Sequence, residues 1–299
     1  MSASTATGSA IDAPGQASAA GARAAVYALL VLAALWFLAP FWVMLVTSLK
    51  PTSEIAAGDI FAWPRHPSLA AWAEAWGGAC AGMQCAGVQA GFVNSLEILL
   101  PSLVLSVLLG AWGAYGLSFW TPLGARVLTA VLLFGAFAPY QVFTYPLVGL
   151  FSRLGIYNSL ACIITVHVIF SIPITTFLFT AYYQGIPREL VQAGEVDGAS
   201  YWQIFLRIIL PLSLPAFAIV GIFQTMGIWN DFFFGLVFAG SDHMPMTVEL
   251  NNIVNTTTGE RRYNVDMAAT ILTSAVPLLV SIASGKWFVR ALTSGAVKA

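Results

Sequence analysis

The chemistry available to this sequence depends on polar side chains that stand within long apolar stretches. They carry carboxylate, imidazole, amide and phenol groups, and they are Glu97, Tyr140, Gln141, Tyr145, His167, Asn230 and Asp231. Such groups hydrogen-bond hydroxyl groups, and an aromatic ring beside them can cover the apolar face of a ligand. The same groups also hold helices together in apolar surroundings. They are therefore candidates either for a ligand pathway or for helix packing.

The composition excludes most soluble classes of protein. Of 299 residues, 59% are hydrophobic and 8% are charged, whereas soluble domains are about 25% charged. The 12 Lys and Arg against 13 Asp and Glu leave a net charge of −1. A basic nucleic-acid-binding protein, a disordered chain and an ordinary soluble enzyme do not fit these values. The chain is therefore predicted to lie largely in a membrane.

The gaps between charged residues locate the membrane-spanning segments. A hydrocarbon core of about 30 Å needs roughly 20 helical residues. Six apolar gaps are long enough, and they predict helices over about 24–49, 92–118, 127–151, 158–184, 208–230 and 266–290. The predicted fold is an all-α integral membrane domain over 23–299, with a Gly-rich loop at 50–91. Residues 1–22 are weakly apolar, and we expect them to form a disordered tail.

An even number of spans places both termini on one side of the membrane. With the termini inside, seven Lys and Arg lie on the cytoplasmic side and five on the external side. Cytoplasmic segments of membrane proteins carry the larger share of these residues. We therefore expect both termini in the cytoplasm and the loop at 50–91 outside.

Two cysteines lie in the loop that is predicted to be external. Cys80 and Cys85 are close in a Gly-rich sequence, so they could form a short disulfide in an oxidising compartment. They could also be two unrelated thiols. No further Cys or His stands nearby, so the pair is poor evidence for metal and no metal site is predicted.

One connection between spans is unusually charged. Residues 187–207 hold five charges among 21 residues. Leu190, Ala193 and Val196 recur at a spacing of three, which predicts a short amphipathic helix, and Gly198 follows as a helix break. A helix–Gly–helix at the membrane surface is expected. It could simply connect two spans, or it could dock onto a partner.

The spacing in this segment resembles a known signature. Permease subunits of binding-protein-dependent ABC importers carry Glu-Ala-Ala-x3-Gly-x9-Ile-x-Leu-Pro on the cytoplasmic side. The corresponding residues are Gln192-Ala193-Gly194, Gly198, Ile208 and Leu210-Pro211. Gln192 replaces the family's glutamate, and Gly194 replaces its second alanine. The flanking residues look like the carbohydrate branch of the family, and the loops at 76–85 and 250–255 are most similar to permeases for glucose or mannose.

The resemblance implies a type I ABC importer permease fold with six spans in a bacterial inner membrane. A cytoplasmic coupling helix between the fourth and fifth spans would dock onto a separate ATPase dimer. The candidate coupling residues are Glu189, Gln192, Ala193, Gly194, Glu195, Asp197, Gly198, Ile208, Leu210 and Pro211. The sequence contains no G-x-x-x-x-G-K-[ST] phosphate loop. We therefore expect a transport subunit rather than an enzyme, with no cofactor of its own and with ATP and Mg on the partner ATPase.

The resemblance also implies a solute and further partners. A sugar delivered by an extracytoplasmic binding protein would cross between this chain and a second permease subunit. The polar residues named above would then be candidates for its pathway, although Trp229-Asn230-Asp231 also fits a helix cap at the membrane interface. The segment at 242–266 is either a solvated external loop or the surface that receives the binding protein.

Two other classes of function remain open on the sequence alone. A polytopic membrane enzyme, such as a lipid-linked sugar transferase, would need clustered acidic or His residues at one interface, whereas His66, His167 and His243 are scattered. An ion-coupled secondary transporter would need internal repeats and an intramembrane carboxylate. No repeat is evident, and Glu97 stands alone.

Overall fold

The computed structural model describes residues 15–81, 84–120, 123–255 and 261–296. The regular secondary structure of these residues is helical apart from one short antiparallel ladder between β1 (Cys80–Ala81) and β2 (Gln84–Cys85). The α-helices are α1 (Gly15–Ser48), α2 (Thr52–Ala56), α3 (Ala70–Gly77), α4 (Gln89–Tyr115), α5 (Ala125–Phe137), α6 (Thr144–Arg153), α7 (Leu160–Tyr183), α8 (Arg188–Val196), α9 (Tyr201–Ile204), α10 (Leu210–Leu212), α11 (Leu214–Trp229), α12 (Phe233–Phe238), α13 (Met246–Asn255) and α14 (Tyr263–Ala296). The segments η1 (Gly116–Trp120) and η3 (Phe205–Ile209) are π-helical, and η2 (Tyr140–Phe143) is a 3₁₀ turn.

Within the described residues, four helical segments are long and apolar enough to cross a membrane, namely Gly21–Ser48, Gln89–Trp120, Leu160–Tyr183 and Tyr263–Gly285. Two bent pairs of segments meet the same test only when each pair is taken together, namely Ala125–Phe137 with Tyr140–Arg153, and Tyr201–Leu212 with Leu214–Trp229. If each bent pair is one broken span, the described part of the chain has six spans. The all-helical membrane fold predicted from the sequence is confirmed.

The third predicted span is not one helix. α5 and the segment Tyr140–Arg153 meet at an angle of 101°. Pro139 has no backbone N–H with which to continue α5, and Ala138 before it adopts extended backbone angles (φ −68°, ψ 135°). The segment predicted as a span over 127–151 is therefore a bent pair of helices, and Tyr140 lies at the bend.

The fifth predicted span is bent as well. The helical segments on either side of Ser213 meet at 76°. Pro211 and Pro215 lie in the first turns of α10 and α11, which are positions where proline is tolerated, whereas it interrupts the interior of a helix. The straight part of the span predicted over 208–230 therefore begins only at Leu214.

α1 begins before the predicted start of the first span. Residues 15–22 belong to this helix, so the prediction of a disordered tail over 1–22 is wrong for that part, and residues 1–14 lie outside the described residues. The segment is rich in alanine, the strongest helix former. Because it continues a helix that already exists, no new nucleation is needed.

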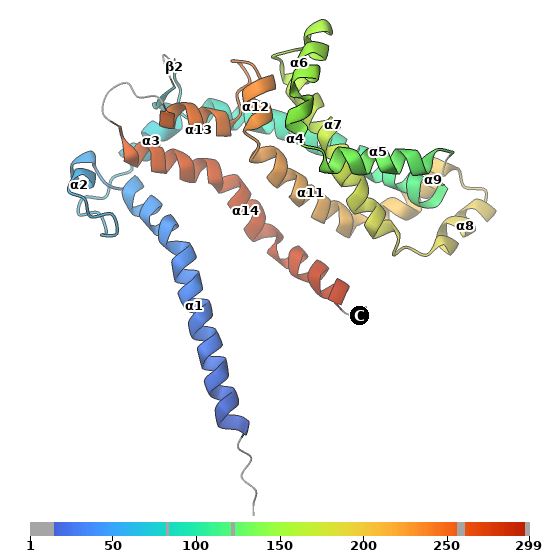
Figure 1. Cartoon of the computed structure of the whole chain (residues 1–299), viewed down its shortest axis with the longest axis horizontal. Helices are drawn as coiled ribbons and strands as arrows, with labels where there is room; N and C mark the ends of the chain where they lie inside the picture. Colours follow the sequence, from blue (N-terminus) through green and yellow to red (C-terminus); the bar gives the residue numbers. More distant parts are fainter. Residues whose placement is uncertain (1–14, 82–83, 121–122, 256–260, 297–299) are drawn as a thin grey trace, which may run out of the picture.

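The helices form an elongated molecule whose two ends differ (Figure 1). α2, α3, α13 and the β1–β2 ladder lie toward one end of the long axis, and α8 and α9 lie at the other. α4 packs against α7 in the body of the molecule. α1 extends away from this body and contacts α14. The segment with the coupling-type spacing is thus far from the segment that contains the cysteines.

α4 and α7 approach closely because small residues line their contact. Gly110 of α4 faces Thr175 of α7, and a Cβ atom at position 110 would overlap the threonine side chain. The Thr175 hydroxyl lies within donor range of the carbonyl oxygens of Ser171 (2.9 Å) and Ser106 (3.2 Å). Small residues permit such close approach between membrane helices.

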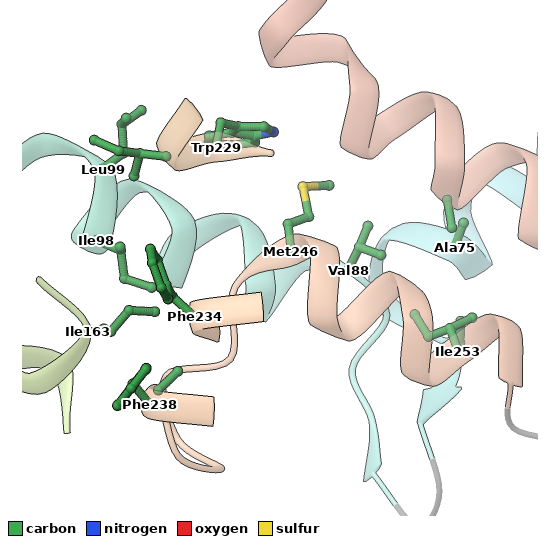
Figure 2. Packing of buried hydrophobic residues seen from close by; sticks show 14 of the residues in the cluster. Ala75, Val88, Ile98, Leu99, Ile163, Trp229, Phe234, Phe238, Met246 and Ile253 are labelled. Carbon is green, nitrogen blue, oxygen red and sulfur yellow. The ribbon is translucent and has the colours of Figure 1, made fainter. Parts of the chain in front are cut away.

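Buried apolar side chains gather in two clusters. The first joins α3, α4, α7, α12 and α13, and Figure 2 shows Phe234 and Phe238 of α12 near Ile98 of α4 and Ile163 of α7. The second lies under α8 and α9 and includes the fully buried Ile204. The first cluster therefore positions α12 and α13, and the second positions α8.

Polar contacts between distant segments fix the end that carries α3 and α13. Glu74 of α3 forms an ion pair with Arg262, which precedes α14. At the start of α13, the backbone N–H of Met246 donates to Oγ of Ser95 on α4 at 2.8 Å. These contacts tie α3, α4, α13 and α14 together.

The two loop cysteines form a disulfide. Cys80 and Cys85 face each other directly in the β1–β2 ladder, and their Sγ atoms are bonded. Gly87 follows with φ +56°, where its Cα lies too close to the backbone of Trp76 to accommodate a Cβ atom. The hairpin is therefore held directly against the end of α3.

Candidate functional site

A cavity of about 540 Å³ lies where α7, α11 and α12 meet the turn at Tyr140. Three separate stretches of the sequence line it, namely Tyr140, residues 167–174 and residues 224–234. Its polar lining consists of Tyr140, His167, Ser171, Gln224, Asn230 and Asp231. The bend after Pro139 brings Tyr140 to this place, and the end of α11 brings Asn230 and Asp231.

Another part of the lining is aromatic and includes Phe234 of α12. The Phe234 ring stacks on Phe170 with centroids 5.2 Å apart and meets Tyr140 edge-on at 5.0 Å. Tyr140 also contacts Phe233 at 5.5 Å. Stacked and edge-on pairs are the favoured arrangements of aromatic rings, so the rings hold one another in place. The cavity thus offers an apolar wall beside hydrogen-bonding groups.

His167 and Asp231 face each other at the polar side. His167 of α7 is 5% exposed, and its Nε2 atom lies 3.8 Å from Oδ2 of Asp231. The imidazole also meets the Phe234 ring edge-on at 5.4 Å. A separation of 3.8 Å is too long for a direct hydrogen bond, so a hydroxyl group in the cavity has both an imidazole and a carboxylate to bind.

The Asp231 carboxylate also begins α12. Its Oδ2 accepts a hydrogen bond from the backbone N–H of Gly235 (3.0 Å), and its Oδ1 accepts one from Phe234 (3.3 Å). These N–H groups have no partner within the first turn of a helix. Asp231 therefore caps the start of α12 rather than the end of the fifth span, where the sequence suggested a cap, and the same side chain lines the cavity.

Gln224 is a cavity residue that sequence reasoning missed. Its side chain is 4% exposed, and its Nε2 atom has no hydrogen-bond partner among the described residues. An unpartnered buried amide costs about 1–3 kcal/mol, and this one belongs to the lining of the cavity. The signal was present in the sequence as an amide within the strongly apolar helix Leu214–Trp229.

The structure brings together four of the seven polar residues proposed from the sequence, namely Tyr140, His167, Asn230 and Asp231. The other three do not line the cavity, since Glu97, Gln141 and Tyr145 are exposed elsewhere. A 3₁₀ turn rotates by about 120° per residue, which separates the directions of Tyr140 and Gln141.

In the described part of the chain, no three His, Cys, Asp or Glu side chains are placed to hold a metal ion.

The charged segment forms the helix–Gly–helix that its sequence predicts. α8 ends at Val196, and Gly198 follows with φ +76°, a conformation that glycine adopts without strain. Ser200 then begins α9 through a capping box with Gln203. The turn at Gly198 therefore sets the direction between the two helices.

Gly194 allows α8 to pack closely against the body of the protein. It is buried, and a Cβ atom there would lie 3.2 Å from Cγ1 of Ile204 and 3.2 Å from Cδ1 of Ile208. An alanine, as in the family signature, would require these side chains to shift by a few tenths of an ångström. The departure from the signature thus accompanies tight contact between α8 and the residues after α9.

Most of the other proposed coupling residues face away from the body. The exposed ones are Glu189, Gln192, Ala193, Glu195, Asp197, Gly198 and Pro211, whereas Ile208 and Leu210 are half-buried. Val196 at the end of α8 is 87% exposed. Leu190 of the same helix is 41% exposed, so α8 presents both carboxylates and apolar side chains on its free surface.

An aromatic cluster joins α9 to α4. The Tyr115 hydroxyl at the end of α4 donates to the backbone oxygen of Tyr201 at 3.2 Å. The Tyr115 ring also lies 4.7 Å from the Tyr201 ring and 5.2 Å from the Phe205 ring. Because these groups are large and mostly buried, a displacement of α9 would be transmitted to α4.

Residues 99–296 match the family model described as binding-protein-dependent transport system inner membrane component. The match covers α8, the turn at Gly198 and the whole lining of the cavity. The chain belongs to this family. The family assignment agrees with the resemblance seen in the spacing from Gln192 to Pro211.

This family member is similar to permeases of ABC transporters. It is 45% identical over 175 residues to a probable ABC transporter permease protein of Pyrococcus horikoshii, a match that covers 58% of this chain and 63% of the relative. It is 36% identical over 224 residues to the alpha-glucoside transport system permease protein AglG of Rhizobium meliloti, covering 72% of this chain and 58% of the relative. The chain thus spans less than two thirds of the length of these two relatives.

The fold of this family member is also found in a solved structure. A chain in the crystal structure of a bacterial ABC transporter involved in the import of the acidic polysaccharide alginate matches with a TM-score of 0.74 and 19% identity. The match covers 92% of this chain and 98% of the other. The fold is therefore that of a type I ABC importer permease.

Proposed function

We propose that this protein is a membrane-spanning permease subunit of an ATP-driven ABC importer that moves a sugar into the cytoplasm. The observation that carries the proposal is the presence of two features in one chain of this family. One is a cavity among the spans with aromatic and polar walls. The other is α8, an exposed short helix packed through Gly194 against the end of the spans. The cavity can bind a polar solute, and α8 can be displaced by a partner protein that docks on it.

Coupling would pass through contacts between α8 and α4. α8 rests on Ile204 and Ile208 through Gly194, and Tyr201 and Phe205 pack on Tyr115. A closing ATPase dimer that displaced α8 would therefore move α4 and with it α7. Such a rigid-body displacement switches the accessible side of a cavity. The sequence has no phosphate loop, so ATP and Mg would be bound by the partner ATPase.

A sugar suits the cavity because its walls are of two kinds. Phe234 and Tyr140 provide ring faces, while Gln224, Asn230 and His167 provide groups that bond hydroxyls. The relatives support this class of solute, since one is named for alpha-glucoside transport and a transporter of like fold is described as importing alginate. The loops at 76–85 and 250–255 support glucose, mannose or a related sugar within this class.

The proposal includes an orientation and three kinds of partner. We propose that α8 and both termini lie in the cytoplasm of a bacterium, as the distribution of Lys and Arg favours. A second permease subunit would complete the sugar pathway. An extracytoplasmic sugar-binding protein would dock at the end that carries α13, on the segment at 242–266, of which 256–260 lie outside the described residues. The family assignment gives no support to a membrane enzyme or an ion-coupled transporter.

Reconstitution tests the proposal. The chain would be placed in liposomes with a second permease subunit and the ATPase dimer, with the binding protein outside and ATP inside. Uptake of radiolabelled glucose, mannose and xylose would be compared with uptake of methionine. We expect ATP-dependent uptake of at least one sugar and none of methionine.

Two controls make the result specific. An ATPase variant that binds but does not hydrolyse ATP should abolish uptake. Uptake by this chain alone in response to a proton or sodium gradient would overturn the ABC assignment. ATP-dependent uptake of methionine without any sugar would overturn the proposed solute while leaving the coupling intact.

A further inference from the structure

The segment between α2 and α3 is a loop with a defined backbone. The Glu54 carboxylate accepts hydrogen bonds from the backbone N–H groups of Arg65 and His66, both at 3.0 Å. The Lys50 ammonium donates to the backbone oxygen of Asp59 at 2.6 Å, and the Asp59 side chain accepts from Ala62 N–H at 3.1 Å. These charged side chains thus form hydrogen bonds with the backbone of the loop itself.

The apolar side chains of this loop point outward instead. Ile60 is 53% exposed, Phe61 is 58% exposed and Trp63 is 55% exposed. Three large apolar side chains within four residues are thus exposed, and together they form an apolar patch of the loop. Because the backbone is fixed, the patch is a built feature, and exposed patches of this kind mark contact with another apolar phase.

Trp42 of α1 determines where this patch lies relative to the membrane. Its indole Nε1–H donates to the backbone oxygen of Phe61 at 3.0 Å, and its ring lies 5.9 Å from the Trp63 ring. Trp42 is inside the apolar segment Gly21–Ser48, six residues before its end, which corresponds to about 9 Å along the helix axis. The loop therefore folds back along the outside of a membrane span.

The depth of Trp42 is that of a membrane interface. The segment Gly21–Ser48 has 28 residues, or about 42 Å of helix, against a hydrocarbon core of about 30 Å. With the core centred on this segment, Trp42 lies within one helical turn of its boundary. Tryptophan and tyrosine concentrate at this boundary in membrane proteins.

We propose that Ile60, Phe61 and Trp63, together with Trp42, form a lipid anchor that inserts into the headgroup–acyl boundary on the side of the membrane opposite α8. The hydrogen bonds that Lys50 and Trp42 donate and that Glu54 accepts make the insertion possible, because backbone groups near hydrocarbon must be satisfied within the protein. The face of α1 on which the loop rests is itself exposed and apolar, with Leu38 at 58% and Phe41 at 63%. The anchor thus continues a surface that already faces lipid.

Fluorescence quenching by brominated lipids tests the anchor. A bimane label would be attached to Phe61→Cys in a Cys162→Ser background, with the Cys80–Cys85 disulfide left intact. The protein would be placed in phosphatidylcholine nanodiscs brominated either near the headgroup or near the acyl ends. We expect strong quenching at position 61 that is greater with the shallow bromines than with the deep ones.

Two labelled controls bracket this result. Leu38→Cys, further inside the span, should be quenched more by the deep bromines, and Thr52→Cys, exposed at the start of α2, should be quenched least. If Phe61→Cys fails to fold, Ile60→Cys reports on the same patch. The measurement would be repeated in the assembled transporter. Quenching at position 61 no greater than at position 52, or its loss on assembly, would overturn the proposal, the latter because another subunit would then cover the patch.

Discussion

The Nε2 atom of His167 on α7 lies 3.8 Å from Oδ2 of Asp231, whose carboxylate also caps the first turn of α12. The Asp231 side chain therefore positions the helix that carries Phe234, and it also faces the imidazole of His167. A ligand that bound between the two groups would act directly on the start of α12.

Replacement of Asp231 tests its role as a cap. Asp231→Ala should lower the free energy of unfolding by about 1–2 kcal/mol, because the N–H groups of Phe234 and Gly235 lose their acceptor. Asp231→Asn retains one acceptor oxygen and should lose less. Thermal unfolding in nanodiscs measures both, with Asp242→Ala on an exposed turn as control. Equal losses for the alanine and asparagine variants would contradict capping.

Replacement of Gln224 should separate stability from transport. Gln224→Leu removes a buried amide that lacks a partner, so the thermal unfolding temperature should stay the same or rise. Loss of one hydrogen bond to the sugar, about 1.4 kcal/mol, should weaken apparent affinity in the uptake assay about tenfold.

The matched control for Gln224 is Phe223→Leu, since Phe223 is the preceding residue of the same helix and is 51% exposed. It should change neither quantity. Wild-type affinity in Gln224→Leu would show that this amide does not bind the sugar.

A larger side chain at Gly194 should uncouple the ATPase. Gly194→Leu cannot fit against Ile204 and Ile208, which leave only 3.2 Å to a Cβ atom, so α8 would be displaced. We expect loss of co-purification with the ATPase while membrane insertion continues. Val196→Leu on the exposed end of α8 is the control and should retain binding. Retained ATPase binding by Gly194→Leu would argue against the coupling role.

The disulfide should prevent alkylation of Cys80 and Cys85 and should stabilise the β1–β2 hairpin. Cys80 and Cys85 should resist alkylation until a reductant is added, because their Sγ atoms are bonded. The double variant Cys80→Ser with Cys85→Ser should lower the free energy of unfolding of this region by about 2 kcal/mol, the chain-entropy value for so short a loop. Mass spectrometry of alkylated protein provides the measurement. Free labelling of both residues before reduction would disprove the bond.

The Glu249 carboxyl should make stability depend on pH. Glu249 lies on α13, which is too short to cross a membrane, and burial raises its pKa above the ordinary value of 4.5. The folded protein therefore binds this proton more tightly than the unfolded chain. The free energy of unfolding should fall as the pH rises from 4.5 through the raised pKa, and it should remain lower above it.

Glu249→Gln should remove this contribution. The variant should be more stable than the wild type at neutral pH and equal to it below pH 4.5, as measured by thermal unfolding across this range. A constant difference at all pH values would instead indicate a change in packing.

Local patterns in the sequence were sufficient to predict which segments are membrane spans and which segment forms the helix–Gly–helix at the surface. Long gaps between charges identified the spans because hydrocarbon excludes charge, and the spacing around Gly198 predicted the helix–Gly–helix because glycine favours that break. The bend at Pro139 was missed, although the proline was visible, because hydropathy reports only that a segment is apolar. The helical start at Gly15 was missed for a related reason, since low hydrophobicity does not prevent an Ala-rich segment from extending an existing helix.

The cavity shows what only the tertiary structure decided. The sequence identified polar residues within apolar segments, but Glu97 and Gln141 turned out to face outward, whereas Gln224 and Phe234 belong to the lining. A helix places its side chains all around its axis, so which of them meet depends on how α7, α11 and α12 pack and where they bend. The sequence by itself determined that this is a multi-span membrane protein with a surface helix. The packing of distant helices decided which side chains form the cavity, because that requires contacts that no local pattern encodes.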